Sequence, residues 1–477
     1  MSEAIVVGAG PNGLASAVAL ARAGVAVTVL EAENEIGGGA RSGELTVPGL
    51  IHDVCSAVHP MAVGSPFLCS LGLERHGLEW RWPEVDCAHP LDDGSAGVML
   101  RSLEATAEGL GDDAAAWRRV FAPARSFDAL TDDLYRPFLH FPRHPIRLVR
   151  FGLPAAMPAT VLARAWKTPQ ARALFGGVAA HALTSLRQPM SSAVGMALIA
   201  ACHRFGWAVA RGGSQSIADA LAAVLLEHGG KIETGVRVTE LPTADLVLLD
   251  LAPAGVADLA GERLPGRIAH AYRRYRHGPG AFKVDFAVEG GVPWTNGRCR
   301  QAGTVHLGGP FEELAAAELE ITRGRMPQRP FVLVSQQYLA DPERSSGSVH
   351  PVWAYTHVPN GYDGDAEQAL IAQIERFAPG FRDRIVASAA RSTREIAESN
   401  HNYIGGDILT GANTPTQVLA RPRFALDPYS TGIPGVFICS AATPPGAGAH
   451  GINGHNAAQS ALRHLRQGDA PVRPATR

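Results

Sequence analysis

The sequence predicts an α/β fold in which a Rossmann-like dinucleotide-binding domain is interleaved with a second domain, made of an antiparallel sheet and a helical cap. The chain opens with a strand, a glycine-rich turn, a helix and a second strand over residues 5–31. From about residue 100 to 205, prolines break a helical region into short pieces. The nucleotide-domain pattern then returns twice, so the two domains alternate along the chain. A length of 477 residues is sufficient for two hydrophobic cores.

These changes of pattern predict discontinuous domains. We expect the dinucleotide-binding domain to comprise residues 1–75, 206–260 and 400–477. Residues 76–205 and 261–399 are expected to form the substrate domain, which carries the cap. The two domains are therefore expected to be interleaved along the chain and not sequential.

The antiparallel sheet is predicted from alternation of residue types. Between Phe282 and Val288, apolar residues alternate with Lys283, Asp285 and Ala287, which is typical of a strand with one buried face. We expect Lys283 to be a surface or salt-bridged lysine and not a catalytic one. Further strands are predicted over residues 304–307, 331–336 and 352–358.

Composition excludes several classes of protein. The formal net charge is −2, so no overall positive field attracts nucleic acid. The six cysteines form no CxxC pair and have no histidine at metal-ligand spacing, so we expect neither a redox disulfide nor a metal site. The N-terminus enters a strand directly and no charge-free apolar run reaches 18 residues. We therefore expect a cytoplasmic protein without a transmembrane helix.

The opening turn carries the first candidate site. Gly8, Gly10 and Gly13 lie between a strand and a helix, where the backbone can approach a pyrophosphate and the helix N-terminus favours its charge. Glu31 follows 18 residues after Gly13, at the end of the second strand, where a carboxylate accepts hydrogen bonds from ribose hydroxyls. An acidic residue disfavours a 2′-phosphate. The unit therefore predicts FAD or NAD in preference to NADP.

The next element favours FAD. The run Gly37-Gly38-Gly39-Ala40-Arg41-Ser42 resembles the Gly-Gly-x-x-Arg element of flavoproteins related to monoamine oxidases and phytoene desaturases. The resemblance extends over almost the whole chain to the phytoene-desaturase-like branch. The matching stretches are residues 53–60, 211–215, 278–283, 353–357 and 439–448. It implies a glutathione-reductase-like FAD-binding Rossmann domain, with Gly38, Gly39 and Arg41 near the diphosphate or the flavin.

The resemblance also implies contacts at both ends of FAD. The segment Val236–Val238, expected as a strand, should reach the adenine, with Val238 as the main contact. The tail at Ser440 and Ala441 should reach the other end. Many members of the wider superfamily carry Gly-Asp after the final strand, so here Ser440 or backbone groups must substitute.

The last helix offers a further flavin contact. The N–H groups of Gly451, Ile452 and Asn453 precede it and can face the flavin N1/C2 carbonyl. The loop at residues 446–451 also matches GxGxxG, but the chain ends too soon for a second dinucleotide unit, so we expect this loop to line the flavin.

Hydride transfer to a flavin requires mainly orientation and a dry pocket, so no catalytic side chain is obligatory. His450 is the candidate for taking a proton, with a structural hydrogen bond as the alternative. The segment at residues 138–150 mixes apolar and basic residues, either to dip into a membrane interface or, as its prolines favour, to pack in the cap.

The predicted function is an FAD-dependent dehydrogenase or desaturase that removes hydride from a lipophilic or conjugated small molecule. Without a separate nicotinamide domain, oxygen or a quinone is expected as the electron acceptor. A redox-neutral flavin-dependent isomerase, an amine oxidase and a non-catalytic FAD-binding assembly protein are the alternatives.

Overall fold

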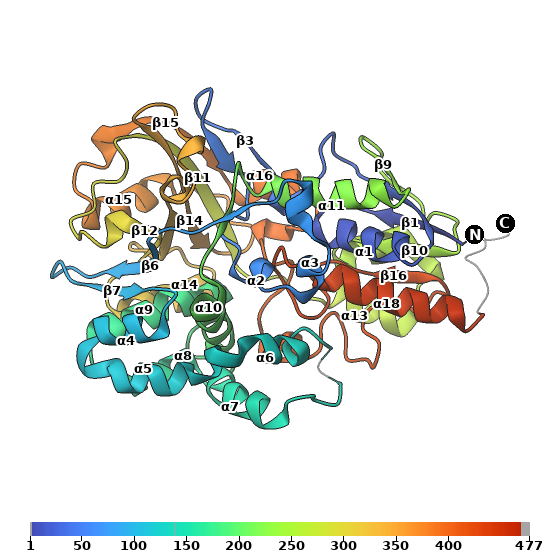
Figure 1. Ribbon diagram of the computed structural model, residues 1–477, viewed down its shortest axis with the longest axis horizontal. Coiled ribbons are helices and arrows are strands. Elements are labelled where there is room, and N and C mark those ends of the chain that lie inside the picture. The colour runs from blue at the N-terminus through green and yellow to red at the C-terminus, as the bar shows by residue number, and fades with distance from the viewer. Residues whose placement is uncertain (1, 138, 469–477) are drawn as a thin grey trace.

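The computed structural model describes residues 2–137 and 139–468. Five strands in this part of the chain form a parallel sheet in the order β16-β10-β1-β2-β9. The strands are β1 (Glu3–Val7), β2 (Ala26–Leu30), β9 (Lys231–Glu233), β10 (Leu246–Leu249) and β16 (Val436–Ile438). The predicted Rossmann-like α/β fold is confirmed, and its strands come from three separate stretches of the chain (Figure 1).

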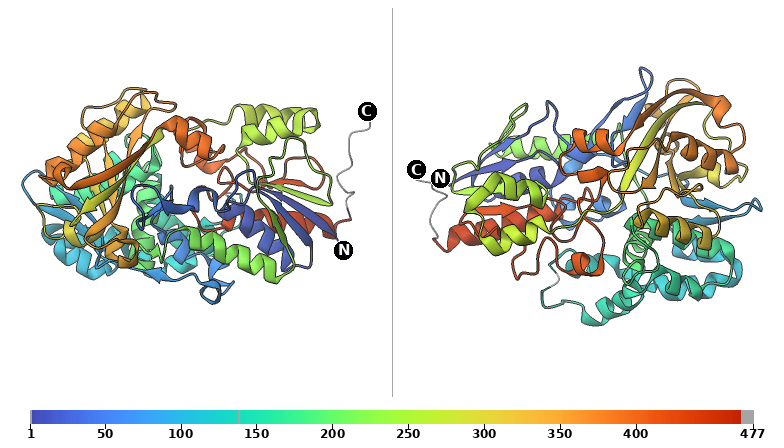
Figure 2. Two further views of the ribbon diagram at one scale, coloured as in Figure 1. Left: turned by 90° about the horizontal axis from the view of Figure 1, so that it is seen from above. Right: turned by 180° about the vertical axis from the view of Figure 1, so that it is seen from behind.

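Helices cover both faces of this sheet (Figure 2). One face packs against α1 (Pro11–Ala21), α11 (Gln215–Glu227) and α18 (Ile452–Arg466). The other face packs against α12 (Pro253–Ala260) and α13 (Gly266–Arg273). Pro11 occupies the first turn of α1, where its missing N–H costs nothing. Helix α13 lies beyond the predicted boundary at residue 260 yet packs on the parallel sheet, and the domain limits stay a prediction.

The second sheet has seven strands within the described residues, in the order β15-β11-β14-β13-β12-β6-β7. Its neighbours are antiparallel except for the parallel pair β12 and β6. The strands are β6 (Val85–Pro90), β7 (Ala96–Met99), β11 (Gly280–Glu289), β12 (Ala302–Leu307), β13 (Val332–Ser335), β14 (Val349–Val358) and β15 (Ile385–Arg391).

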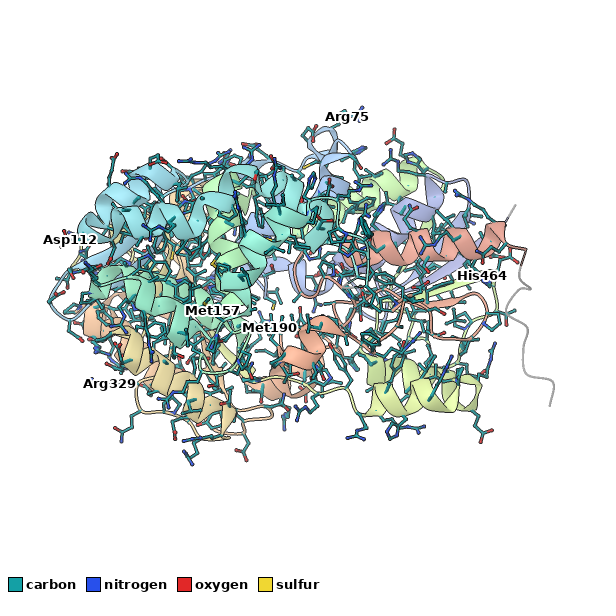
Figure 3. The ribbon with its side chains drawn as sticks, turned by 90° about the horizontal axis from the view of Figure 1, so that it is seen from below. Arg75, Asp112, Met157, Met190, Arg329 and His464 are labelled. Carbon is teal, nitrogen blue, oxygen red and sulfur yellow. The ribbon has the colours of Figure 1, made fainter. Side chains whose placement is uncertain are left out.

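Helices also enclose this sheet. Helix α15 (Glu367–Phe377) covers one face, and the helical cap and α16 (Thr393–Ser399) contribute to the core on the other. The cap comprises α4 (Leu103–Gly109), α5 (Ala114–Phe121), α6 (Phe127–Leu134), α7 (Pro145–Ala156), α8 (Ala159–Leu162), α9 (Pro169–Ala179) and α10 (Ser192–Phe205). Met157 and Met190 lie together on its underside (Figure 3), where the N–H of Met190 donates to the carbonyl of Ala156.

Two expectations about strands are wrong. Strand β11 is buried on both faces, because His52 and the ring of Trp353 cover the side that carries Lys283 and Asp285. Residues 236–238 form no strand. Gly235 turns the chain with φ +72°, and the following N–H donates to the Glu31 carbonyl.

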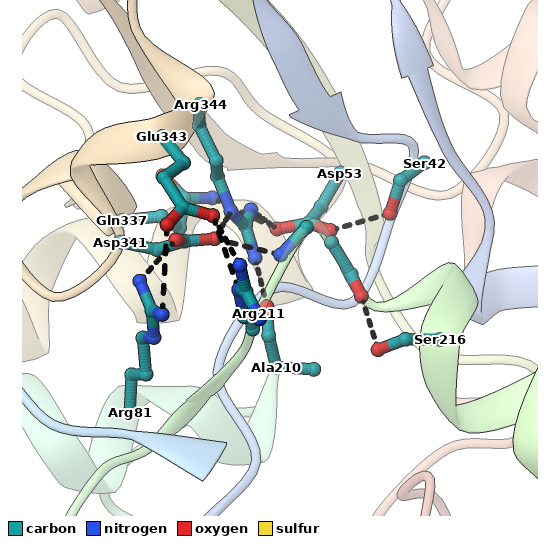
Figure 4. A network of polar contacts seen from close by, with 12 residues as sticks. Ser42, Asp53, Arg81, Ala210, Arg211, Ser216, Gln337, Asp341, Glu343 and Arg344 are labelled. Carbon is teal, nitrogen blue, oxygen red and sulfur yellow. Dashed lines mark hydrogen bonds and ion pairs between the residues drawn. The ribbon is translucent and has the colours of Figure 1, made fainter. Parts of the chain in front are cut away.

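A buried ionic network joins the parallel-sheet region to the antiparallel sheet (Figure 4). Arg344 donates to Asp53 at 2.6 Å and to Asp341 at 3.0 Å, and its third bond goes to the carbonyl of Ala210. Burial alone would raise the pKa of Asp53, but Arg344 and the N–H of Ser214 hold it below its ordinary value. The network fixes how the two parts of the chain meet.

In the described part of the chain, no single helix is long and apolar enough to cross a membrane. Helix α7 and the segment Ala159–Ala165 meet that criterion only together, by length and composition, as a pair bent by 98°. Phe138, the first residue of the mixed apolar and basic segment, lies outside the described residues.

Candidate active site

One cavity of about 440 Å³ runs between the two sheets. Its first part, the dinucleotide end, is lined by Gly8, Gly10, Glu31, Arg41 and Val238, among others. Its second part, which we call the substrate end, is lined by side chains of the cap and of the antiparallel sheet. These are His181, Leu183, Val194, Leu198, Trp207, Thr304, Leu333, Trp353 and Tyr355. A single continuous space thus connects the glycine-rich turn to a largely apolar chamber.

The glycine-rich turn leaves the N-terminus of α1 open toward the cavity. Gly10 is the N-cap and has no side chain with which to cap the helix, and the first turn carries no acidic residue, although Asp250 accepts the N–H of Gly13 from outside the helix. A Cβ at Gly13 would lie 2.0 Å from the carbonyl oxygen of Gly8, so only glycine permits this close approach. An open helix N-terminus beside a tight backbone turn fits the diphosphate of a dinucleotide.

Glu31 is held in place beside this turn. Its Oε2 accepts the N–H of Ala9 at 2.6 Å, and its Oε1 accepts the N–H of Glu33 at 3.0 Å. Each carboxylate oxygen has a second lone pair, so Glu31 can still accept from a ribose hydroxyl. Val238 lines the same end of the cavity. Its backbone contact to adenine stays a prediction.

The Gly-Gly-x-x-Arg element also lines the cavity. Gly38 adopts φ +52°, and a Cβ at Gly39 would lie 2.0 Å from the hydroxyl of Tyr403. Arg41 donates through Nε to the carbonyl of Gly38 at 3.0 Å and through Nη2 to that of Ser399 at 2.7 Å. The guanidinium is therefore fixed at the cavity wall, where a positive charge suits a phosphate.

Only part of the C-terminal tail reaches the cavity. Ala441 and the loop Ala447–Ala449 line it, as expected for the loop, whereas Ser440, Gly451, Ile452 and Asn453 do not. The reason is the close packing of α18 against α1: a Cβ at Gly454 would lie 1.9 Å from the carbonyl oxygen of Asn12.

Two groups at the start of α18 are also occupied. The backbone N–H of Ile452 donates to Nδ1 of His450, and the side-chain amide of Asn453 donates to the Thr443 carbonyl at 2.8 Å. The geometry therefore gives no support to flavin contacts from Gly451, Ile452 and Asn453, or to one from the Ser440 side chain. From the tail, the small residues Ala447, Gly448 and Ala449 of the loop before α18 line the cavity, together with Ala441.

His450 has a structural place. It is 2% exposed and packs against Tyr135 with ring centroids 5.3 Å apart, and its Nδ1 accepts the Ile452 N–H at 3.1 Å. Burial lowers its pKa to about 4. The structure thus favours the alternative of a structural hydrogen bond, and the proposed catalytic role of His450 finds no support in this geometry.

Lys283 lies in a buried charged cluster next to the cavity. It pairs with Asp285, which also contacts His52 and Arg391 at 3.4 and 3.9 Å. Burial lowers the pKa of Lys283, while Asp285 opposes this shift. The predicted salt bridge is present, although the lysine is not at the surface.

Sequence reasoning missed Asp250. It follows β10 directly, at the edge where carboxyl ends of parallel strands meet, and its Oδ2 accepts the N–H of Gly13 at 3.0 Å. Burial raises its pKa to about 7, and the nearby Glu31 carboxylate adds to the shift. The available signal was an acidic residue directly after a fully apolar strand.

Asp250→Asn is expected to change the pH dependence of stability. Between about pH 4 and 7 the folded protein keeps the Asp250 proton while the unfolded chain releases it, so the free energy of unfolding falls as pH rises. The asparagine variant lacks this dependence and still accepts from Gly13. Relative to wild type it should gain roughly 1–3 kcal/mol between pH 5 and 7, measured by urea unfolding. Parallel pH profiles for the two proteins would contradict this expectation.

Comparison with known proteins agrees with this architecture. Residues 6–65 match the family model of the NAD(P)-binding Rossmann-like domain. The chain is 24% identical to the mouse (Mus musculus) pyridine nucleotide-disulfide oxidoreductase domain-containing protein 2, over 97% of this chain and 94% of that one. It is 30% identical to the hydroxyneurosporene desaturase of Cereibacter sphaeroides, over half of each chain. A putrescine oxidase structure superimposes with a TM-score of 0.61 at 17% identity, covering 98% of this chain and 99% of the other.

The fold and the cavity define a two-part oxidoreductase with a Rossmann-like dinucleotide-binding domain. The chain is similar in sequence to phytoene-desaturase-like oxidoreductases and has the fold of amine oxidases.

Proposed function

We propose that this protein binds FAD along the cavity and removes hydride from an apolar or conjugated small molecule at the substrate end. The observation that carries the proposal is the continuity of the cavity from Gly10 and Glu31 to the chamber formed by Leu198, Leu333 and Trp353. A ligand that spans the dinucleotide end would bring its far end to this chamber.

The residues of the chain would share the binding of FAD. The N-terminus of α1 and Arg41 would hold the diphosphate, Glu31 the ribose hydroxyls, and Val238 the adenine. Gly38 and Gly39 would allow the chain to pass close to the cofactor. When bound, FAD would supply the hydride acceptor. The chain would supply orientation and a chamber that excludes water, which is what such a transfer requires.

The lining favours a lipophilic substrate. Most side chains at the substrate end are aliphatic or aromatic, and the relatives include proteins named hydroxyneurosporene desaturase and phytoene desaturase. An amine oxidase reading is less well supported, because no carboxylate of the described residues lines the substrate end to bind an ammonium ion. Oxygen or a quinone stays the predicted electron acceptor, and a cytoplasmic location also stays a prediction.

Peripheral membrane contact is part of the proposal. Phe141 and Ile146 are 92% and 71% exposed, and Leu153 also faces solvent, close in sequence to the exposed Arg147. Apolar side chains beside basic ones suit an interface with anionic lipid. Co-sedimentation with anionic phospholipid vesicles tests this part.

An absorbance titration of the purified protein tests the main proposal. FAD bands are expected, and anaerobic addition of the right class among polyenes, alcohols and amines should bleach them. Glu31→Ala is expected to weaken FAD binding by roughly tenfold, because about 1.4 kcal/mol of charge-assisted hydrogen bonding is lost. Absence of FAD bands after reconstitution would refute the cofactor assignment. Bands that no substrate class bleaches would shift the proposal to an isomerase or a binding protein.

A further inference from the structure

The substrate end is largely apolar and carries a few neutral polar groups. The charged residues that line the cavity are Glu31, Glu33, Glu35, Arg41, Arg237 and Asp250, all outside the substrate end. Within the described lining, the substrate end offers the imidazole of His181, with the hydroxyl groups of Thr304 and Tyr355 and the indole of Trp353 nearby. A ligand with a charged group would find no counter-charge there.

His181 is the first member of a buried chain of hydrogen bonds. Its Nε2 lies 2.8 Å from Nε2 of His306, and Nδ1 of His306 lies 3.2 Å from Sγ of Cys87. His306 and Cys87 are fully buried. Burial lowers the pKa of His181 to about 3 and that of His306 well below its ordinary value. Both rings are therefore neutral near pH 7, and in each ring one nitrogen carries a hydrogen.

The thiol of Cys87 determines which atom donates in each of these hydrogen bonds. Burial raises the pKa of Cys87 well above its ordinary value, so the sulfur keeps its hydrogen. The nearer acceptor for that hydrogen is Nδ1 of His306, since the carbonyl oxygen of Ala88 lies 3.8 Å away. His306 must then carry its hydrogen on Nε2 and donate it to Nε2 of His181. The remaining hydrogen of His181 stands on Nδ1.

Nδ1 of His181 has no hydrogen-bond partner within the described residues, and the side chain is only partly buried because it borders the cavity. Two neighbouring groups are similarly unpaired. Oγ1 of Thr304 and Nε1 of Trp353 are buried without a partner in the described part of the chain. Unpaired buried donors are costly, which favours a ligand that accepts hydrogen bonds.

We propose that the substrate end binds a neutral, largely apolar molecule that carries one oxygen acceptor, such as a carbonyl, hydroxyl or ether, bound by the Nδ1–H of His181. The inference rests on the proposed function only in that the same cavity holds the substrate. His306 and Cys87 are positioning residues, because they fix which nitrogen of His181 donates. A pure hydrocarbon leaves this donor unpaired, and an ammonium ion meets another donor with no carboxylate.

Four probes with one phenylbutyl body test the ligand class: 4-phenylbutan-2-one, butylbenzene, 4-phenylbutylamine and 4-phenylbutanoate. Binding to the purified, FAD-reconstituted protein is measured by calorimetry. The ketone should bind more tightly than the amine and the carboxylate. His181→Phe keeps an aromatic ring but removes the donor, so ketone affinity should fall roughly tenfold while butylbenzene affinity changes less than about twofold. His228→Phe, at the exposed end of α11, is the matched control and should leave both affinities unchanged.

The positioning role has its own readout. ¹⁵N NMR of histidine-labelled protein should show wild-type His181 protonated on Nδ1, and the His181→Phe variant assigns that signal. Cys87→Ala removes the thiol hydrogen and should convert this signal toward the other tautomer, with about threefold weaker ketone binding. Cys87→Ser keeps a donor and should restore both.

The inference would be overturned if the amine or the carboxylate bound most tightly, or if the ketone did not bind up to its solubility limit. It would also be overturned if His181→Phe lost ketone and butylbenzene binding equally, or if Nδ1 of His181 in the wild-type protein carried no hydrogen. The proposed function fails separately. If the protein binds no FAD but the apoprotein still binds the ketone more tightly than the amine and the carboxylate, the proposed function is wrong and this inference stands. If the protein binds FAD but does not prefer the ketone, this inference is wrong and the proposed function stands.

Discussion

Replacing Arg344 with methionine is expected to lower the free energy of unfolding by roughly 3–5 kcal/mol, because removal of one member of a buried ionic network leaves the others unpaired. Arg344 is 1% exposed and bonds to Asp53, Asp341 and the Ala210 carbonyl. Methionine fills similar space but offers no donor. Urea unfolding of wild type and variant measures the difference.

Arg329→Met is the matched control. Its side chain lies on the outer surface (Figure 3), 65% exposed, with a 3.7 Å ion pair to Glu313. Exposed pairs contribute about 0–1 kcal/mol, so this variant should be close to wild type. A loss below about 1 kcal/mol for Arg344→Met would show that the network does not hold the two sheets together.

Gly13→Ala is expected to abolish FAD binding, with at least a hundredfold loss of affinity. The added Cβ would lie 2.0 Å from the backbone oxygen of Gly8, so the turn must open and the N-terminus of α1 must move. A displaced turn loses the backbone approach to the diphosphate. Flavin fluorescence during reconstitution measures the affinity, and circular dichroism separates loss of cofactor from unfolding.

The control for this change is Gly43→Ala. Gly43 lies in β3 (Ser42–Glu44), its φ is compatible with alanine, and a Cβ there meets nothing within 4 Å. FAD affinity in this variant should match wild type within about twofold. Retention of FAD by Gly13→Ala would mean that the dinucleotide does not depend on this turn.

Local patterns were sufficient for the dinucleotide unit. Gly8, Gly10 and Gly13 follow one strand, and Glu31 stands at the end of the next strand. This spacing indicates contacts between residues that are close in sequence. The turn and its helix are built from consecutive residues, so their geometry is encoded locally. The same holds for Gly38, Gly39 and Arg41, which line the cavity as a short run.

The tail shows where such patterns fail. The sequence indicates that a helix follows Gly451, but its register against α1 depends on the contact between Gly454 and Asn12, which lie more than 400 residues apart in sequence. With α18 packed in this register, Gly451, Ile452 and Asn453 do not line the cavity, and His450 accepts the N–H of Ile452.

By itself, the sequence determined the fold class, the interleaving of the two sheets and the glycine-rich turn between β1 and α1. Only the tertiary structure decided which polar groups reach the cavity. Asp250, which follows β10, accepts the N–H of Gly13 in α1. His181 of the cap region forms a hydrogen bond with His306 of β12. Such pairs carry no local signal, because their chemistry arises from burial and from neighbours that the chain brings together only after it has folded.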